Sequence, residues 1–477
     1  MRTLAQQIES RKGSGFDPVA ALAPWLACVA VGFAVHYGAP LVVNDYWVNV
    51  LRRVGVFVMA AVSLNIVNGF TGQFSMGHAG FMAVGAYVGA GTTYYGSLLL
   101  HGSVNDPGFT TQGTLLMLAG VSLGACVAAG FGYIVGLPSL RLRGDYLAIV
   151  TLGFGEIIRV LLELTKPQLD KAEAVREAGL RTLVSLNGPT GFFGTPAYAT
   201  LFWIWLFAAI TCVVAYRVKV SSSGRAFLSI REDEIAARSM GINLTKYKVR
   251  AFVLAAFFGG VAGALYAHTG VNPSPTDAGF ARSFDIIIFV VLGGLGSISG
   301  AAIAAVVLTV LTEVLRGPQP VLDNWVWLVI IELAVVGAVF GLRAARNGGW
   351  RVLAMTACIV PALMLLAGAS LAIRTASGGK IDLADYRMVL YALMLILLMI
   401  LRPNGLLGVH EVWDLFTAGD KRPPASTKPA VAATVHCVRA QPVGQSGFLR
   451  VLGVEGAVAT ALAALGVVLL LLNVRAA

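Results

Sequence analysis

The chain has 477 residues, of which 57% are hydrophobic and only 12% are charged, and its mean hydropathy is +0.78. Soluble domains carry about 25% charged residues, so this composition excludes a single water-facing globule and requires lipid to cover part of the apolar surface. The net charge of +11 is explained by Lys and Arg gathering on the cytoplasmic side of a membrane, because no basic stretch with interleaved aromatic residues indicates nucleic-acid binding.

The sequence predicts an all-α, polytopic helical membrane protein with roughly 11–13 apolar segments, some of them short or broken. The apolar runs cover residues 19–36, 48–69, 79–100, 115–136, 146–164, 200–217, 249–269, 283–297, 299–316, 325–343, 352–373, 386–401 and 456–474. A helix needs roughly 20 residues to cross the hydrocarbon core, so the runs at 283–297 and 386–401 are short. Glycines and charged residues interrupt the run at 146–164, and such broken segments often line a pathway through the protein.

The apolar pattern divides the chain into four parts. We expect residues 1–18 to form a cytoplasmic N-terminus and residues 19–408 to form a transmembrane domain, whose first run is interpreted as an uncleaved span rather than a signal peptide. Residues 409–455 are rich in Pro, Ala, Lys and Arg and are expected to be a basic flexible linker. The linker leads to an extra C-terminal transmembrane segment at 456–474.

Threading the chain from a cytoplasmic N-terminus through every run gives a consistent orientation. The basic loops at 137–145, 217–250 and 344–351 then lie in the cytoplasm together with the tail, whereas most of the outward loops carry almost no Lys or Arg. The loop at 217–250 alone has eight basic and three acidic residues. Arg52 and Arg53 lie near the outer end of the second span, so we expect them to snorkel or to pair with a neighbouring helix.

A glycine-rich block at residues 69–81, GFTGQFSMGHAGF, joins the second and third runs. Its Gln73, Ser75 and His78 place an amide, a hydroxyl and an imidazole at membrane depth, where polar side chains face a cavity or bond across helices. Together with Glu156 in the interrupted run, they are candidates for the wall of a translocation path. Helix packing through small residues is the alternative, which we favour for any single residue.

The sequence indicates neither catalysis nor cofactor binding. A second glycine-rich block at 291–300, VLGGLGSISG, suggests a phosphate loop only superficially, and the pattern G-x-x-x-x-G-K-[ST] occurs nowhere. The five cysteines contain no C-x-x-C pair, and His78 has no metal-spaced partner. We predict no catalytic residue, no metal and no cofactor in this chain, so any ATP that drives it is expected to be bound by a partner subunit.

The loop at 217–250 contains the segment GRAFLSIREDEIAARSMG at 224–241, which predicts a short amphipathic helix. Its apolar face can be formed by Ala226, Phe227, Ile230, Ile235 and Ala236, with Ala237 beside it. Small residues followed by Gly241 allow such a helix to sit in a groove of a partner and then to turn sharply. An ordinary solvated loop helix is the alternative interpretation.

Five blocks resemble, in order, the LivM-type permease family of ABC importers for branched-chain amino acids. These blocks are residues 69–87, 140–157, 224–266, 291–300 and 401–408. With the spans between them, the resemblance covers roughly residues 45–316 and 386–408. The chain departs from the family in an added helical insertion at about 320–385 and in everything after residue 408.

The resemblance implies a permease subunit without its own nucleotide-binding site, located in the cell inner (plasma) membrane and translocating branched-chain or other neutral aliphatic amino acids. It implies that the 217–250 loop docks into a separate ATPase, although Ile235 stands where the general family pattern has glutamate. The residues assigned to this coupling are Gly224, Arg225, Glu234, Ala236, Ala237 and Gly241. The implied partners are a second related permease, two ATP-binding cassette subunits, an extracytoplasmic substrate-binding protein that touches residues 165–198, and the lipid bilayer.

Other functions stay open at this point. A permease for urea or short amides in the same family is the nearest alternative, because the binding protein largely sets the substrate in such systems. An ion-coupled secondary transporter would need charged relays at membrane depth, for which Glu156, Asp285, Glu313 and Glu332 are candidates. Arg159, three residues after Glu156, is however a natural helical partner for that carboxylate. A non-transporting membrane scaffold is the third alternative.

Overall fold

A computed structural model describes residues 18–41, 44–102, 104, 111–139 and 145–316 of the chain. Every regular element in this part is a helix. The elements are α2 (Pro18–Gly38), η1 (Ala39–Leu41), α3 (Asp45–Asn65), η2 (Ile66–Phe70), α4 (His78–His101), α5 (Thr111–Ser139), α6 (Asp145–Glu163), α7 (Ala172–Ala178), η3 (Gly179–Val184), η4 (Gly188–Thr190), α8 (Leu201–Val220), α9 (Ser222–Glu232), α10 (Glu234–Ser239), α11 (Leu244–Ala267), η5 (Pro275–Ala278), α12 (Phe280–Gly293) and α13 (Ile298–Arg316). The predicted insertion at 320–385, the linker, the last two spans and most of the N-terminus lie outside the described residues.

The predicted all-α membrane fold is confirmed within the described residues. Each apolar run from 19–36 to 299–316 corresponds to one helix, with ends that differ by a few residues. Four helices are long and apolar enough to cross a membrane by length and composition: Asp45–Phe70, Gln112–Leu137, Leu201–Val220 and Leu244–Ala267. The short run at 283–297 is also short as a helix, because α12 ends after 14 residues at Gly293.

The predicted interruption of the run at 146–164 is wrong, because α6 is a continuous helix of 19 residues. Gly153 borders open space, while a Cβ atom added at Gly155 would lie 3.2 Å from the Ala278 carbonyl oxygen. The second glycine therefore allows a close approach without breaking the helix. Arg159 bonds to Glu156 at 2.6 Å and to Glu163 at 2.5 Å, and such pairs one turn apart stabilise a helix.

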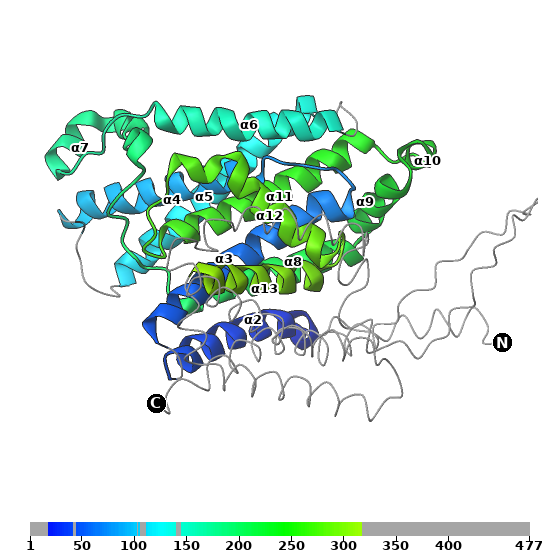
Figure 1. Cartoon of the computed structure of the whole chain (residues 1–477), viewed down its shortest axis with the longest axis horizontal. Helices are drawn as coiled ribbons and strands as arrows, with labels where there is room; N and C mark the ends of the chain where they lie inside the picture. Colours follow the sequence, from blue (N-terminus) through cyan, green and yellow to red (C-terminus); the bar gives the residue numbers. More distant parts are fainter. Residues whose placement is uncertain (1–17, 42–43, 103, 105–110, 140–144, 317–477) are drawn as a thin grey trace, which may run out of the picture.

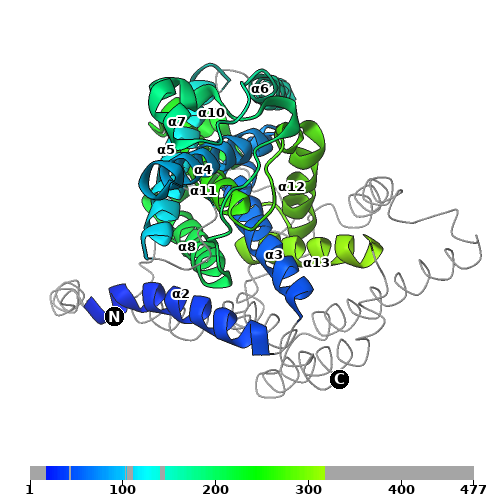
Figure 2. The ribbon, with the colours of Figure 1, turned by 90° about the vertical axis from the view of Figure 1, so that its left-hand side faces the viewer.

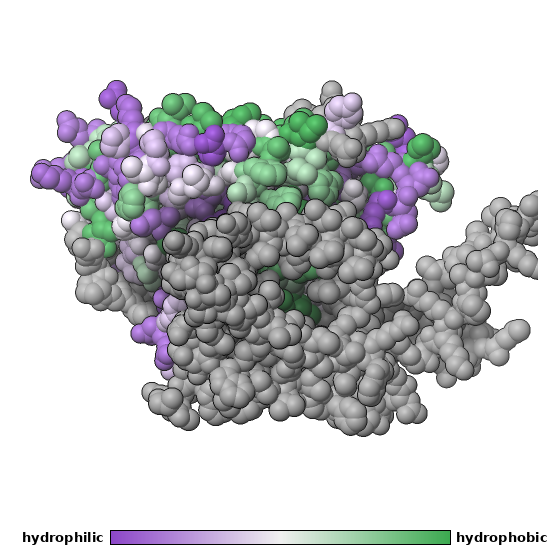
Figure 3. Space-filling model, viewed as in Figure 1, coloured by the Kyte–Doolittle hydropathy of each residue, from purple (hydrophilic) through white to green (hydrophobic). Residues whose placement is uncertain are grey.

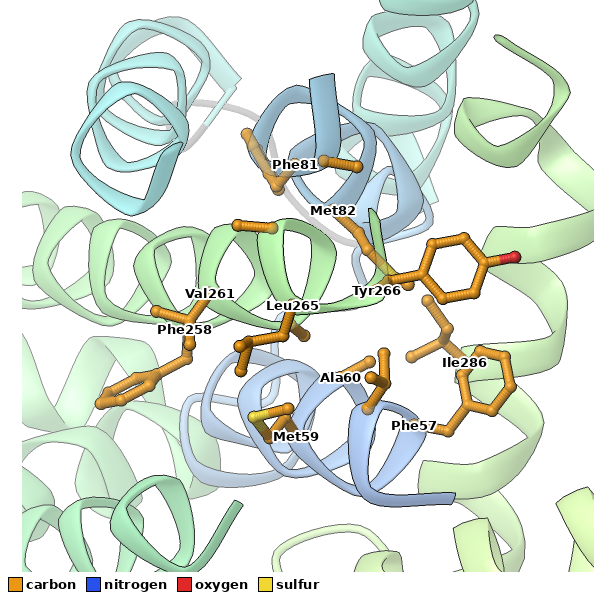
Figure 4. Packing of buried hydrophobic residues seen from close by; sticks show 14 of the residues in the cluster. Phe57, Met59, Ala60, Phe81, Met82, Phe258, Val261, Leu265, Tyr266 and Ile286 are labelled. Carbon is orange, nitrogen blue, oxygen red and sulfur yellow. The ribbon is translucent and has the colours of Figure 1, made fainter. Parts of the chain in front are cut away.

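The core consists of α3, α4, α5 and α11, packed through small residues. Figure 4 shows α11 between α4, which contributes Phe81 and Met82, and α3, which contributes Met59 and Ala60. A Cβ atom added at Gly263 of α11 would lie only 1.7 Å from the Met82 carbonyl oxygen. Membrane helices associate through such backbone contacts, since lipid offers no hydrophobic driving force between them.

The loops gather at two opposite ends of the bundle. In Figure 1, α9 and α10 lie at one end and α7 lies at the other, as threading predicts for loops 217–250 and 165–198. We call them the α10 end and the α7 end. Figure 2 places α6 and α2 on opposite edges of the same bundle.

An apolar band lies between these ends on the face seen in Figure 3. Hydrophobic residues cover the region of α6, and hydrophilic residues gather toward the α7 and α10 ends. The α6 residues that contribute most exposed apolar surface are Tyr146 (70% exposed), Ile149 (63%), Ile157 (59%) and Leu161 (54%). This distribution is what a helix facing hydrocarbon requires.

Near the α7 end, the expectation that Arg52 or Arg53 pairs with a neighbouring helix is confirmed for Arg53. Its Nη1 atom lies 3.5 Å from Oε2 of Glu313 on α13. The Tyr46 hydroxyl donates to the other oxygen of the same carboxylate at 2.8 Å. Arg52 instead donates to Oδ1 of Asn49 on its own helix.

Candidate functional site

The helix that starts as α3 breaks at the α10 end. After Asn65 it continues as the π-helical turn η2, and residues 71–77 are then non-helical until α4 begins at His78. Gly72 permits the change of direction because its φ of +68° is accessible to glycine. The Met76 amide donates to Thr151 Oγ1 of α6 at 3.0 Å. Backbone freed from a helix at membrane depth needs such partners.

The break and the first residue of α4 hold three of the four residues that the sequence assigns to a translocation path. His78 is buried, with Nε2 2.7 Å from Ser63 Oγ of α3, and a Cβ atom added at Gly259 of α11 would lie 3.0 Å from its ring. His78 therefore joins three helices. The amide of Ser75 donates to Asn68 Oδ1 at 3.1 Å, which closes the break on itself.

Gln73 is the unusual residue of the break. Its side chain is 5% exposed, yet neither amide atom bonds to any residue in the described part of the chain. Burying an amide without hydrogen-bond partners costs free energy. Such a group in a native protein is often explained by a bound water or solute. Among the predicted path residues, Gln73 is therefore the one whose side-chain amide is buried without a hydrogen-bond partner in the described residues.

Glu156 does not join the other predicted path residues. It lies on α6, where it accepts a hydrogen bond from Arg159 Nε at 2.6 Å and another from the Phe280 amide at 3.3 Å. The carboxylate thus satisfies the first amide of α12, and the predicted helical pair with Arg159 is confirmed. Acidic groups are stabilising at a helix N-terminus.

A second break lies beside the first, at the turn between α12 and α13. Gly294 and Gly296 have φ values of +108° and +90°. Asn65, at the end of α3, accepts from the Gly296 amide at 2.9 Å and donates to the Ser297 carbonyl oxygen at 2.9 Å. Sequence reasoning missed Asn65, because one polar amide near the end of the run at 48–69 does not show which backbone groups it will bond to.

The loop at 217–250 folds into two helices, so the predicted single helix over 224–241 is wrong. Asp233 separates them, with φ −156° and ψ 114°, and its carboxylate accepts from the amides of Ile235 and Ala236 at 2.7 and 3.1 Å. This N-cap starts α10 in a new direction. The predicted apolar face is consequently wrong at two positions, since Ile235 and Ala236 are exposed and Ala237 is buried against Ile230.

The residues assigned to ATPase coupling fall into two groups. Gly224 and Ala237 are buried, and a Cβ atom added at Gly224 would lie 2.1 Å from the Val218 carbonyl oxygen. These two residues shape the loop from within. Arg225, Ala236 and Gly241 are exposed at its surface.

Glu234 holds the loop to the bundle. Its Oε1 atom lies 2.5 Å from Nζ of Lys248 on α11, and the Lys248 side chain is only 6% exposed. Beyond this pair, Ile235 of α10 is 70% exposed, and Met240, directly after α10, is 83% exposed. Gly241 follows with φ +83°, and a Cβ atom added there would meet nothing within 4 Å. The surface of this loop is thus partly apolar, open and bordered by charge.

The α7 end carries the loop at 165–198, which contains the short helices α7, η3 and η4. Asn187 adopts a left-handed conformation and donates to the Gly191 carbonyl oxygen at 2.8 Å. The Phe192 amide donates to the Pro273 carbonyl oxygen at 2.9 Å, and the Tyr95 hydroxyl donates to the Ser185 carbonyl oxygen. These bonds tie the loop to the bundle over much of its length.

The chain is similar to permeases of known transport systems. The family described as "Branched-chain amino acid transport system / permease component" matches residues 46–340. The high-affinity branched-chain amino acid transport system permease protein LivM of Salmonella typhimurium is 36% identical over 58% of this chain, and that of Escherichia coli K12 is 35% identical over the same share. LivH of Escherichia coli K12 is 25% identical over 53% of this chain and 79% of its own length.

The similarity to the two LivM proteins covers 65% of their length. No solved structure matches the chain. The matched family region contains both helix breaks and the whole 217–250 loop. The chain belongs to the permease-component family of branched-chain amino acid transport systems.

Proposed function

We propose that this chain is the membrane-spanning permease subunit of an ABC importer that carries branched-chain amino acids across the inner membrane. ATP hydrolysis in separate subunits drives the transport. The α10 end faces the cytoplasm, and the α7 end faces the opposite side. The proposal is supported by the family match and by the names of the LivM and LivH relatives.

The observation that carries the proposal is the apolar surface of α10. Ile235 of α10 is 70% exposed, and Met240, directly after α10, is 83% exposed. In Figure 1, α10 lies at one end of the bundle. Lipid covers such side chains only within the band. Outside it, an exposed apolar patch with a polar rim is typical of a protein-binding surface. An ATP-binding subunit is the partner that we assign to it.

The remaining partners follow from the same assignment. A second, related permease completes the membrane part, two ATP-binding cassette subunits bind the cytoplasmic loops, and an extracytoplasmic binding protein delivers the substrate to the α7 end. The ordered loop at 165–198 gives that protein a surface of mixed charge, with four basic and three acidic residues.

Uptake in a strain that lacks this gene tests the substrate. We expect the uptake of radiolabelled leucine, isoleucine and valine to fall, and expression of the intact chain to restore it. Unchanged uptake of all three amino acids would contradict the proposal. A selective loss of urea or acetamide uptake would instead assign the chain to the urea and amide branch.

A further inference from the structure

Arg231 reaches from the cytoplasmic loop into the helix break. It lies near the end of α9, and its Nη1 atom donates to the Gly69 carbonyl oxygen at 2.8 Å. The stem of the same side chain packs on the next turn of the chain, since a Cβ atom added at Gly72 would lie 3.1 Å from Arg231 Cγ. One side chain of the loop therefore contacts both sides of the point where η2 gives way to residues 71–77.

Lys219 makes a matching contact with the second break. It lies at the end of α8, and its Nζ atom donates to the Gly296 carbonyl oxygen at 2.8 Å. The same ammonium lies 5.8 Å from the centre of the Phe70 ring. The 217–250 loop is thus attached by one cation to each break.

The breaks explain why cations are needed here. Gly69 lies at the end of a helical turn and Gly296 lies in a tight turn, so their carbonyl groups lack the partners that a continuing helix would supply. The C-terminal end of a helix carries a partial negative charge that favours Arg or Lys. Arg231 and Lys219 satisfy these carbonyl groups with charge-assisted hydrogen bonds.

The contact region is packed without spare room. A Cβ atom added at Gly69 would lie 2.0 Å from Asn65 Oδ1 and 2.4 Å from the Gly296 amide nitrogen. A Cβ atom added at Gly296 would lie 2.7 Å from Arg231 Nη1. The two glycine backbones, Asn65 and the guanidinium thus form one continuous set of contacts between α9 and both breaks.

From this arrangement we infer that Arg231, supported by Lys219, is the positioning residue that transmits movement of the ATPase-docked loop to the two helix breaks. The inference rests on the proposed function. Docking and transmission are divided between two surfaces of the loop. Ile235 on α10 and Met240 directly after it are exposed, while Arg231 reaches from α9 to the Gly69 carbonyl group in the bundle.

The test uses the whole complex of this chain with its partner permease, ATP-binding subunits and binding protein, reconstituted in proteoliposomes. For Arg231→Ala, we expect leucine transported per ATP hydrolysed to fall about tenfold, a typical size for the coupling between two sites. The ATP-binding subunits should still co-purify with the chain, because the outward surface of α10 is unchanged. Arg231→Lys, which keeps one charged donor, should restore part of the coupling.

Lys246→Ala is the matched control, because it removes one positive charge from an exposed side chain in the same loop. It should leave the ratio of leucine to ATP unchanged. Normal coupling in Arg231→Ala, or equal losses in Arg231→Ala and Lys246→Ala, would overturn the inference. So would loss of the ATP-binding subunits from Arg231→Ala, which would make the residue part of the docking surface. Absence of ATP-driven leucine uptake in the unmodified complex would count against the proposed function instead.

Discussion

Several residues at the α10 end make contacts that cannot be inferred from their chemical type alone. Asn65 bonds to the backbone of the α12–α13 turn, Asp233 divides the loop into two helices, and Glu234 pairs with Lys248. Each contact joins residues far apart in sequence or changes the direction of the chain. The glycine block and the basic loop were recognisable in the sequence. The pairing of Asn65 and the exposure of Ile235 depend on tertiary contacts and a local cap that residue periodicity does not encode.

Gly241 provides a test of the docking surface at the residue scale. We expect Gly241→Trp to lower the ATP hydrolysis stimulated by loaded binding protein by about fivefold or more, because the indole would fill the open surface after α10. Gly241→Asn should retain most of the stimulation, since asparagine tolerates the left-handed conformation that φ +83° requires. ATPase assays of the reconstituted complex measure both. Full stimulation in Gly241→Trp would show that this surface remains uncovered.

At the scale of helices, apolar patterning predicts the spans well and their interruptions poorly. The nine runs from 19–36 to 299–316 match helices, because lipid allows only backbone that satisfies its own hydrogen bonds. The interruption expected in 146–164 is absent, and the actual break at 71–77 lies in the glycine-rich block at 69–81, for which a translocation path and helix packing were both open. Glycine occurs both in close helix contacts and in turns, so the sequence alone does not distinguish the two. The tertiary surroundings of each glycine determine which one forms. Gly155 faces the Ala278 backbone, whereas Gly72 adopts φ +68°.

The glycine contacts of α11 make a stability prediction at this scale. Gly263→Ala should lower the free energy of unfolding by about 1–3 kcal/mol, the usual cost of overpacking a core, because the added methyl group would meet the Met82 carbonyl oxygen. Gly130→Ala on α5 is the matched control, since a Cβ atom there has nothing within 4 Å. Thermal unfolding in detergent compares the two variants. Equal stability of both would contradict the close packing of α4 and α11.

At the scale of the whole molecule, the described part of the chain is a bundle with α9 and α10 at one end and an apolar band beside that end (Figures 1 and 3). Two of the four carboxylates that a secondary transporter could use are paired with local cations, Glu156 with Arg159 and Glu313 with Arg53. Glu332 lies outside the described residues. The links between loop and breaks run through Arg231 and Lys219 instead. This arrangement favours a mechanism in which an ATPase drives transport by moving the cytoplasmic loop. It does not favour one in which protons pass along a chain of carboxylates.

The most direct test of this account is leucine accumulation in proteoliposomes that contain the complete complex. We expect accumulation when ATP reaches the ATP-binding subunits and loaded binding protein reaches the α7 end, and none when either component is omitted. The chain reconstituted without ATP-binding subunits should not accumulate leucine under an imposed proton gradient. Accumulation by the isolated chain under that gradient would contradict the account and identify an ion-coupled transporter.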